Sequence, residues 1–563
     1  MNTIERISKM AGERLVYLPL GGAGEVGMNM YLYGYGKPGK ERFILVDMGV
    51  TFPDMDGTPG VDLIFPDIEW IADRAKRLDA IFITHAHEDH VGAVGHLYSR
   101  LKAPIYARKF TSHIAALKMA EHGYDGSEIN VVGAMPEQVQ VGKFKVGFMP
   151  ISHSIPESSG LVIDTPDGRV VHSGDFKIDE TPVLGEAFDR EAWAALAPVK
   201  ALICDSTNVF SRHEGRSEAT VGPNIVPLVR DATGMVVATT FASNIARVKT
   251  LAEAGREAGR SICLMGRSMQ RMVKAGIETG VVTDFPPYIL PEEARDVPRE
   301  NLMILATGSQ GERRAATAQL SRGKFLGISL REGDTVLFSS KTIPGNETSV
   351  GQIVNNFSEL GVDVIDDKMA DIHVSGHANR PDLEEMHRLV KPQILIPNHG
   401  EHRMLREHAK IGEANGIASM VAPNGTMVSL SGDRPEVVEF VETGRLYLDG
   451  SVQIGALDGV VRDRIRMALN GQAVIGILID EDDEALTDAW CELRGLPEQG
   501  RSNAPLQDIL EADVGQFLGR ADAKTIANDD KLEDQIKRIV RQTSQKEIGK
   551  KPEVVVLISR LTA

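Results

Sequence analysis

The stretch THAHEDH, residues 84–90, follows the apolar run AIFI and places four potential metal ligands within six positions. Side chains two apart in an extended segment point the same way, so His85 and His87 can share one ion. If the chain then turns into a helix at VGAVGHL, Asp89 and His90 swing toward a neighbouring position and can hold a second ion. Ligand types packed this closely favour a metal site over a polar loop that happens to be rich in histidine.

Two coordination spheres need more ligands than this heptapeptide holds, and the chain supplies them after other strand-like runs. His153 stands in PISHSIPES, Asp175 in VHSGDFK and His399 in IPNHGEH, each beside small or turn residues. Any one of them alone is better explained as a loop residue, but together with THAHEDH they predict a shared site. Imidazole and carboxylate ligands without thiolate suit two Zn²⁺ ions, and Mn²⁺ also fits. Two such ions would activate a water molecule and clamp the oxygens of a phosphodiester.

The arrangement of apolar runs indicates an α/β fold with several domains. Short β-rich runs alternate with helical stretches in residues 1–210, and residues 211–365 follow a strand, helix, strand rhythm typical of a parallel sheet. Ligand residue types reappear in residues 366–440, so we expect the second domain to be inserted into the first, which the later segment completes. Glycine and aspartate predict a linker at residues 441–455, and residues 456–563 predict a small C-terminal α/β domain.

Cysteine usage and hydropathy limit where the protein works. The chain has three cysteines, far apart and in no paired motif, which fits a reducing cytoplasm. Cys204 lies in the apolar run ALICDST and is predicted to be a buried core thiol. No apolar run approaches the roughly eighteen residues of a membrane span, so we expect a cytoplasmic location and no membrane partner.

The formal net charge of −17 argues against a nucleic-acid partner, because phosphate contacts usually come from lysine and arginine. Net charge does not describe the local field, however, and two divalent cations would add positive charge where a phosphate must lie. We therefore expect a narrow basic channel on an acidic body. Lone charges on an α/β domain are mostly solvated, but six basic residues are candidates to line the channel: Arg247, Lys249, Arg267, Arg271, Lys274 and Lys341.

Two further motifs lie outside the ligand set. In DIHVSGHANR, Ser375 offers a hydroxyl, Gly376 permits close approach of a backbone, and His373 can donate to a phosphate oxygen. A phosphate clamp and a strand end followed by a turn explain this segment equally well when it is taken alone. GGAGEVG, residues 21–27, lacks the GxGxxG spacing of a dinucleotide loop and is predicted to be a tight turn near the active site.

In order and in local text, the ligand residues resemble the motifs of the metallo-β-lactamase superfamily, with LVDMG as the first motif. This resemblance implies an αββα sandwich with a two-metal centre. It also implies the role of each residue: His85, His87 and His153 at one ion, Asp89, His90 and His399 at the other, Asp175 bridging them, and Asp47 orienting the site from behind the ligands.

The segments LICDSTNV and HVSGHA resemble the β-CASP family, and GGAGEVGMNM, FASNIARV and TGSQGE resemble its ribonuclease J members over roughly residues 15–440. This resemblance implies an inserted β-CASP domain. It also implies an RNA substrate, because RNA-processing members of the family carry histidine where His399 stands. Arg313 and Arg314 depart from the Pro and Met usual after GSQGE, which leaves the role of that loop open. The resemblance implies these substrate-binding residues: Ser243, His373, Val374, Ser375, Gly376 and His377. The resemblance also implies three catalytic roles. His377 would be the general acid that protonates the leaving 3′ oxygen, Asp205 would orient His377, and Asp175 would lie at the reacting centre.

The expected function is two-metal hydrolysis of RNA phosphodiester bonds in RNA maturation and mRNA decay. The resemblance alone gives the direction, a 5′→3′ exonuclease with some endonuclease activity and a preference for a 5′ monophosphate. It also implies a homodimer or homotetramer, associated through the C-terminal domain, and other RNA-decay proteins as partners. A small-molecule hydrolase stays an alternative, against which residues 211–365 count, as does a non-catalytic RNA-binding scaffold, whose signature would be a missing ligand.

Overall fold

The computed structural model describes residues 12–561 except 344, 483 and 487, so the predicted first and last segments each extend beyond the described residues. The chain divides into two compact units. One unit ends at Arg445 and lacks the segment Phe52–Ile64. The other joins Phe52–Ile64 to the chain from Leu446 onward, and each unit is described here by itself.

Two mixed sheets form the centre of the first unit. One sheet has the strand order β26 (Glu436–Phe440), β25 (Thr426–Ser429), β1 (Arg14–Gly21), β3 (Met30–Gly36), β4 (Arg42–Val46), β6 (Leu78–Ile83), β7 (Ile105–Ala107) and β8 (Ile129–Val131). The other has the order β24 (Ala418–Ser419), β22 (Pro392–Asn398), β13 (Val199–Asp205), β12 (Gly168–His172), β11 (Ser159–Thr165), β10 (Phe144–Pro150) and β9 (Gln138–Val141).

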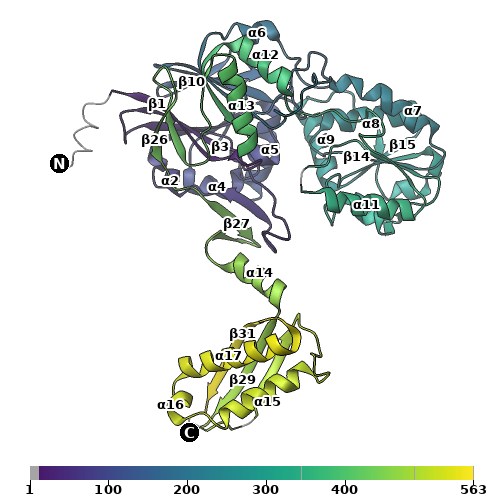
Figure 1. Cartoon of the computed structure of the whole chain (residues 1–563). Helices are drawn as coiled ribbons and strands as arrows, with labels where there is room; N and C mark the ends of the chain where they lie inside the picture. The colour runs from purple at the N-terminus through teal and green to yellow at the C-terminus, as the bar shows by residue number, and fades with distance from the viewer. Residues whose placement is uncertain (1–11, 344, 483, 487, 562–563) are drawn as a thin grey trace. The chain divides into compact units, whose positions relative to one another are not determined.

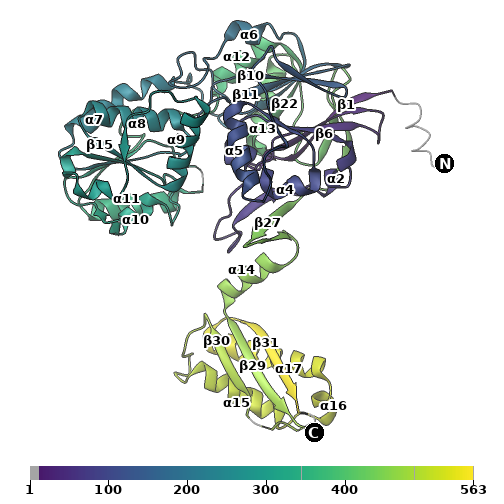
Figure 2. The same cartoon turned by 180° about the vertical axis from the view of Figure 1, so that it is seen from behind.

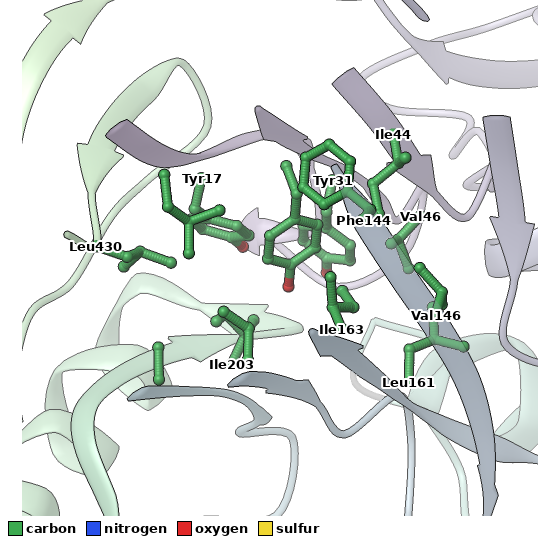
Figure 3. Packing of buried hydrophobic residues seen from close by; sticks show 14 of the residues in the cluster. Tyr17, Tyr31, Ile44, Val46, Phe144, Val146, Leu161, Ile163, Ile203 and Leu430 are labelled. Atoms are coloured by element: carbon green, nitrogen blue, oxygen red, sulfur yellow. The ribbon is translucent and has the colours of Figure 1, made fainter. Parts of the chain in front are cut away.

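Figure 3 shows the core between these sheets, where alternating strand residues meet face to face. Tyr17, Tyr31 and Ile44 come from the first sheet, and Phe144 and Ile163 come from the second. All five side chains are buried. Because each strand exposes one face to this core and the other to a helical layer, both faces of the strands are apolar.

Helices cover the outer faces of both sheets (Figures 1 and 2). The first sheet lies against α2 (Glu69–Ala72), α4 (Val94–Leu101) and α5 (Lys109–Ala120). The second lies against α6 (Arg190–Ala194), α12 (Arg380–Val390) and α13 (His402–Ala414), which bury Trp193, Leu383 and Ile411 on it. The layers therefore run helix, sheet, sheet, helix, which confirms the predicted αββα sandwich.

The second domain of this unit is a parallel sheet with helices on both faces, as its sequence rhythm predicts. The strand order is β16 (Tyr288–Ile289), β15 (Ser261–Met265), β17 (Leu302–Ala306), β14 (Val236–Thr239), β20 (Thr335–Phe338) and β21 (Asp363–Ile365), and every pair is parallel. One face packs on α7 (Gly222–Asp231), α8 (Ile245–Glu257) and α9 (Arg267–Thr279), and the other on α10 (Ala316–Ser321) and α11 (Glu347–Glu359).

The chain returns from this parallel sheet into the sandwich. Strand β22 pairs in parallel with β13, which precedes the second domain, and the register places Asp205 opposite Asn398. Strand β25 then pairs with β1 at the start of the chain. The later segment thus completes the first domain, and it brings Asp205 and His399 to the same end of the sheet.

The second unit contains a hairpin where the sequence predicts a linker, formed by β27 (Arg445–Asp449) and β28 (Val452–Gly455). Strand β5 (Leu63–Pro66) joins it as a third strand. Helix α14 (Val460–Asn470) leads to a sheet in the order β30 (Trp490–Arg494), β29 (Gln472–Ile479) and β31 (Glu553–Arg560). The helices α15 (Leu506–Leu518) and α17 (Asp529–Ile548) pack on one face of that sheet, as the two views show (Figures 1 and 2).

The environment of the cysteines and the character of the described helices can be compared with what cysteine usage and hydropathy led us to expect. Cys204 is fully buried, as predicted, and Cys263 and Cys491 are also free and buried. None of the described helices combines the length and the apolar character that crossing a bilayer requires.

Candidate metal centre

Histidine and carboxylate side chains meet at one end of the sandwich in groups that could hold metal ions. In the described chain, the ligand atoms within each group lie within 4.8 Å of one another. The groups are His85 with His87, His153 and Asp175; Asp89 with His90, Asp175 and His399; and Asp175 with Asp205, His377 and His399. Asp175 belongs to all three, so its carboxylate is the common point of the cluster.

The first group gathers around the end of β6. His85 and His87 follow this strand in extended conformation, and His85 Nε2 lies 3.2 Å from His87 Nδ1. His153, on the loop after β10, has its Nε2 atom 3.1 Å from the same His87 Nδ1. Asp175 Oδ2 lies 3.9 Å from His85 Nε2 and 3.8 Å from His153 Nε2. Three imidazoles and one carboxylate therefore converge on a single point.

The second group forms because the chain turns into a helix directly after His87. Helix α3 (Glu88–Val91) carries Asp89 and His90, as the sequence predicts. His90 Nε2 lies 3.2 Å from Asp175 Oδ2 and 3.5 Å from Asp89 Oδ2. His399 arrives from the later segment after β22, with Nε2 3.3 Å from Asp89 Oδ2 and Nδ1 2.7 Å from Asp175 Oδ1. The backbone at His399 has a φ of +45°, which turns the side chain off the strand.

Asp47 supports this cluster from behind. Its Oδ2 atom lies 2.7 Å from His90 Nδ1, so the other ring nitrogen of His90 faces Asp175. Thr84 donates its backbone N–H to Asp47 Oδ1 at 2.8 Å and its hydroxyl to Oδ2 at 2.9 Å. Asp47 itself has a φ of +64° and is fully buried. Such a contact fixes which ring nitrogen of a histidine ligand is free to bind.

Asn29 is a supporting residue that sequence reasoning missed. Its Nδ2 atom lies 2.9 Å from His90 Nε2 and donates to Asp89 Oδ2 at 3.2 Å, while its Oδ1 accepts from the Tyr31 hydroxyl at 2.6 Å. It stands two positions after the glycine-rich segment 21–27, whose strand β2 (Ala23–Gly24) pairs with β23 (Gly400–Glu401) next to His399. The segment lies beside the metal cluster, as predicted, but it contains the short strand β2 and is not a single tight turn.

The segment HVSGH lies against the cluster. His377 Nδ1 is 2.8 Å from Asp205 Oδ2, and His153 Nδ1 is 2.6 Å from the carbonyl oxygen of Gly376. Asn208, which sequence analysis did not single out, donates from Nδ2 to Ser375 Oγ at 2.8 Å and to the His377 carbonyl at 3.3 Å. Val374 is buried beneath this segment in a core of the second domain. Ser243 lies on the loop between β14 and α8.

The expected channel arginines and lysines have differing environments. Arg247 is fully buried and cannot line a solvent-filled channel, so that prediction is wrong. Lys249 pairs with Glu253 and Asp284, and Arg271 pairs with Glu121 of the first domain. A buried guanidinium was not foreseeable from one arginine in an amphipathic helix, because its carboxylate partner, Glu218, lies 29 positions earlier.

Burial and neighbouring carboxylates shift the histidines in opposite directions. Burial lowers the pKa of His85 and His153 well below the ordinary value, and that of His87 to about 4. Burial also acts to lower the pKa of His399, but Asp175 and Asp89 outweigh it and raise the value to about 10. A cluster that packs so many imidazoles around carboxylates matches the donor set of a divalent cation.

The polar atoms of the cluster fit a metal ion. The short contacts of Asp175 Oδ1 with His399 Nδ1 and of His399 Nε2 with Asp89 Oδ2 lack hydrogen-bond geometry, so among the described residues these two buried atoms have no hydrogen-bond partner. Buried polar atoms without a partner are rare in proteins, because each lost hydrogen bond costs about 1–3 kcal/mol. Both atoms lie in the ligand groups described above. Coordination of a cation would satisfy them.

Four family models together match most of the chain. Residues 23–204 match the metallo-beta-lactamase superfamily, and residues 233–357 match the ribonuclease J beta-CASP domain. Residues 362–423 match a Zn-dependent metallo-hydrolase RNA specificity domain, and residues 459–561 match the ribonuclease J C-terminal domain. The last of these is a domain to which the sequence alone gave no identity beyond a small α/β fold.

Individual relatives agree with the family models. The chain is 40% identical to ribonuclease J of Sinorhizobium meliloti over 557 residues, 98% of each chain, and 36% identical to ribonuclease J 1 of Streptococcus pyogenes over 82% of each. A protein of unknown function from Enterococcus faecalis V583 shares the fold, with a TM-score of 0.52 at 16% identity, covering 74% of this chain and 100% of that one. The chain therefore belongs to the ribonuclease J family of the metallo-β-lactamase superfamily.

Proposed function

We propose that this protein hydrolyses RNA phosphodiester bonds with a pair of divalent metal ions. The observation that carries the proposal is Asp175, whose carboxylate lies against both histidine groups of the cluster. Zn²⁺ is the first choice of ion and Mn²⁺ the second, because imidazole and carboxylate ligands suit both. Two bound cations would supply an activated water at neutral pH and charge compensation for the phosphodiester.

Each ligand has an assigned place in this proposal. His85, His87 and His153 would hold one ion, and Asp89, His90 and His399 would hold the other. Asp175 would serve both ions, and Asp47 accepts from His90 Nδ1, which leaves the lone pair of that ring on Nε2. These assignments rest on the distances within each group and on the resemblance to the metallo-β-lactamase motifs.

His377 is the proposed general acid. Its Nδ1 atom lies 2.8 Å from Asp205 Oδ2, so the ring donates that N–H to the carboxylate and presents Nε2–H to the leaving 3′ oxygen. Burial acts to lower the pKa of His377, but Asp205 outweighs it and raises the pKa above the ordinary value. Thr207 in turn donates its hydroxyl to Asp205 Oδ1 at 2.7 Å, which holds the carboxylate in place.

The segment HVSGH forms the proposed binding pocket for the 5′ phosphate of RNA. The pocket consists of Ser243, His373, Val374, Ser375, Gly376 and His377. It lies against the cluster through the contact between His153 and the Gly376 carbonyl, which fits removal of nucleotides counted from a 5′ end. The activity proposed is 5′→3′ exonucleolytic with an endonucleolytic component, in RNA maturation and mRNA decay.

The proposal extends to the protein's surroundings. A cytoplasmic location fits three free, buried cysteines. Self-association to a dimer or tetramer is assigned to the C-terminal sheet, because helices cover one face and the other exposes Trp490, Val555 and Leu557. Other RNA-decay proteins are further expected partners.

The test follows RNA labelled at its 5′ end, with metal content measured on the same protein. We expect chelation to abolish turnover and either Zn²⁺ or Mn²⁺ to restore it, with mononucleotide products from 5′-monophosphorylated RNA. Equal degradation of 5′-monophosphorylated and 5′-triphosphorylated RNA would contradict the pocket assignment. Turnover that survives chelation at zero metal content would contradict the two-metal mechanism.

A further inference from the structure

His373 of the phosphate segment is held by a buried guanidinium. Arg247, on helix α8, is fully buried, and its Nη1 atom lies 3.3 Å from His373 Nδ1. The same atom donates to the carbonyl oxygen of Ile372 at 3.1 Å and of Ser339 at 3.0 Å. Arg247 therefore fixes both the backbone before His373 and the ring of His373 itself.

The charge of Arg247 is balanced by Glu218, which lies on the short helix η2 (Glu218–Thr220). Two parallel contacts join them, Nε to Oε1 at 2.5 Å and Nη2 to Oε2 at 2.8 Å. This geometry orients the guanidinium more strictly than a single contact would. The backbone N–H of Glu218 also donates to Asp179 Oδ2 at 2.9 Å, and that carboxylate pairs with Lys177 at 3.0 Å.

These contacts determine where the proton of His373 sits. A guanidinium only donates, so His373 Nδ1 must face Arg247 with its lone pair. The Ser339 carbonyl accepts from Arg247 at 3.0 Å and from the Thr240 hydroxyl at 3.1 Å, and the Ser339 hydroxyl accepts from Arg247 at 3.0 Å. When His373 Nδ1 accepts from Arg247, the proton of the neutral ring is on Nε2, the nitrogen that does not contact Arg247.

We propose that Glu218 and Arg247 are positioning residues that fix the ring of His373 so that its Nε2–H donates to the 5′ phosphate of RNA. The inference rests on the proposed function and adds to it the residues that set the preference for a phosphorylated 5′ end. Neither residue touches the phosphate. They act through His373 alone, and the buried ion pair keeps that ring in one tautomer and one orientation.

Charged groups around the ring keep it neutral. Burial and then the charges of Arg247 and Lys341 lower the pKa of His373 to about 3, and Lys177 adds to the effect while the Ser339 backbone opposes it. Arg216 lies on the backbone side, where its Nη2 atom donates to the His373 carbonyl at 2.8 Å. A neutral ring would offer the phosphate an N–H donor rather than a positive charge.

The test compares RNAs of one sequence that carry either a 5′ monophosphate or a 5′ hydroxyl. In the variant Glu218→Gln/Arg247→Met, no unpaired charge is left buried, which removes the main reason for such a variant to unfold. We expect the ratio of kcat/KM for the two RNAs to fall roughly ten- to hundred-fold, the range of one hydrogen bond to a charged group. The rate on 5′-hydroxyl RNA should change by less than about threefold.

A thermodynamic cycle separates positioning from general damage. His373→Ala should lower the same ratio, and adding it to the pair variant should lower the ratio no further, because the pair acts only through His373. If the pair variant fails to fold, Glu218→Asp takes its place, because it keeps both charges and shortens only one side chain. It should lower the ratio of kcat/KM, but by less than the pair variant would. Arg14→Met/Glu41→Gln removes another largely buried pair of the same unit, joined at 2.8 Å, and should leave the ratio unchanged.

Three results would overturn the inference: an unchanged ratio, an equal slowing on both RNAs, or a further fall in the triple variant. The wild-type protein is measured first, so failure of the proposed function is seen separately. Absence of any RNA turnover in the wild type would refute that function together with this inference. Turnover without a preference for the 5′ monophosphate would refute only the pocket assignment and this inference.

Discussion

Among single side chains, His87 offers the cleanest test of the ligand scheme. It lies on a loop and is partly exposed, so His87→Ala opens no core cavity. We expect at least a hundredfold loss of RNA turnover, with the melting temperature within about 3 °C of wild type when both are measured without metal. Metal content of the purified variant should fall by at least one ion.

The matched control is His122→Ala, a histidine exposed at the end of α5 and outside the ligand groups. It should keep wild-type turnover and metal content. Full activity in His87→Ala would contradict the assignment of this residue, whereas an equal loss in the His122 variant would indicate that histidine content in general affects the protein.

The side chains that converge in the cluster were recognisable from the sequence, whereas the residues that support them were not. The seven proposed ligands were recognisable because ligand residue types gather in THAHEDH and recur singly after other apolar runs, and the structure brings these side chains together. Asn29 and Asn208 carry no such pattern, since an asparagine beside a turn is ordinary and its partner lies far along the chain. Arg247 illustrates the same limit, because only the fold shows that a helical arginine is buried against Glu218.

At the scale of an element, the loop after β4 can be tested through Gly49. A β-carbon at this position would lie 1.7 Å from the carbonyl oxygen of Asp89 and 2.8 Å from the backbone nitrogen of Asn29. Gly49→Ala must therefore push the start of α3 away from β4, which displaces Asp89 and His90. We expect a loss of about 1–3 kcal/mol in the free energy of unfolding, together with reduced metal content.

Urea unfolding and metal analysis of the same samples provide the measurement. Gly351→Ala is the control, because a β-carbon in this helix α11 position meets nothing within 4 Å. Replacing a helical glycine with alanine there should stabilise the protein by up to about 1 kcal/mol. A Gly49 variant with wild-type stability and metal content would show that β4 and α3 do not approach as closely as described.

Helices α12 and α13 share a buried pair of histidines whose titration should affect stability. His387 Nε2 lies 3.1 Å from His408 Nε2, and His408 Nδ1 lies 2.9 Å from the Ser206 hydroxyl. Burial lowers the pKa of His387 from 6.5 to about 4 and that of His408 well below 6.5. The unfolded chain therefore binds more protons below pH 6.5, so folding stability falls as the pH drops from about 6.5 toward 4.

The expected slope approaches 1.4 kcal/mol per pH unit for each histidine. Urea unfolding is measured from pH 8 to pH 5 in a chelator, so that metal release does not contribute. The variant His387→Leu/His408→Leu should lose clearly less stability over this range than the wild type. Parallel curves for the two proteins would show that the pair does not titrate on unfolding.

The parallel sheet and the return of the chain were predictable elements, but the segment Phe52–Ile64 was not. Strand and helix periods in residues 211–365 are regular, and the repeated ligand types required a completed first domain. In contrast, FPDMDGTPGVDLI is short and rich in Pro, Gly and Asp, which predicts an ordinary loop. Only its long-range contacts show that it belongs with the C-terminal unit, including the hydrogen bond from Asp62 to Leu448.

At the scale of the whole molecule, self-association through the C-terminal sheet can be tested at Trp490. Its indole covers Gly476 on the sheet face that carries no helix, and 46% of its surface is exposed. A carboxylate at this position would be buried in any interface formed there, so Trp490→Glu should weaken association at least tenfold. Sedimentation over a range of protein concentrations provides the measurement.

Phe440→Glu is the control, because Phe440 is 80% exposed but lies on β26 of the first unit. It should associate as the wild type does. A wild type that stays monomeric at tens of micromolar would contradict the assignment of this face, as would an equal effect of both substitutions.

The separation of the ligands along the chain has a consequence for how the protein is made. His399 is the last of them, and it follows the whole inserted domain. A nascent polypeptide still on the ribosome holds the first histidine group long before His399 emerges, and domains fold in order of synthesis. The complete ligand set therefore cannot assemble on a nascent chain until the segment that carries His399 has emerged from the ribosome.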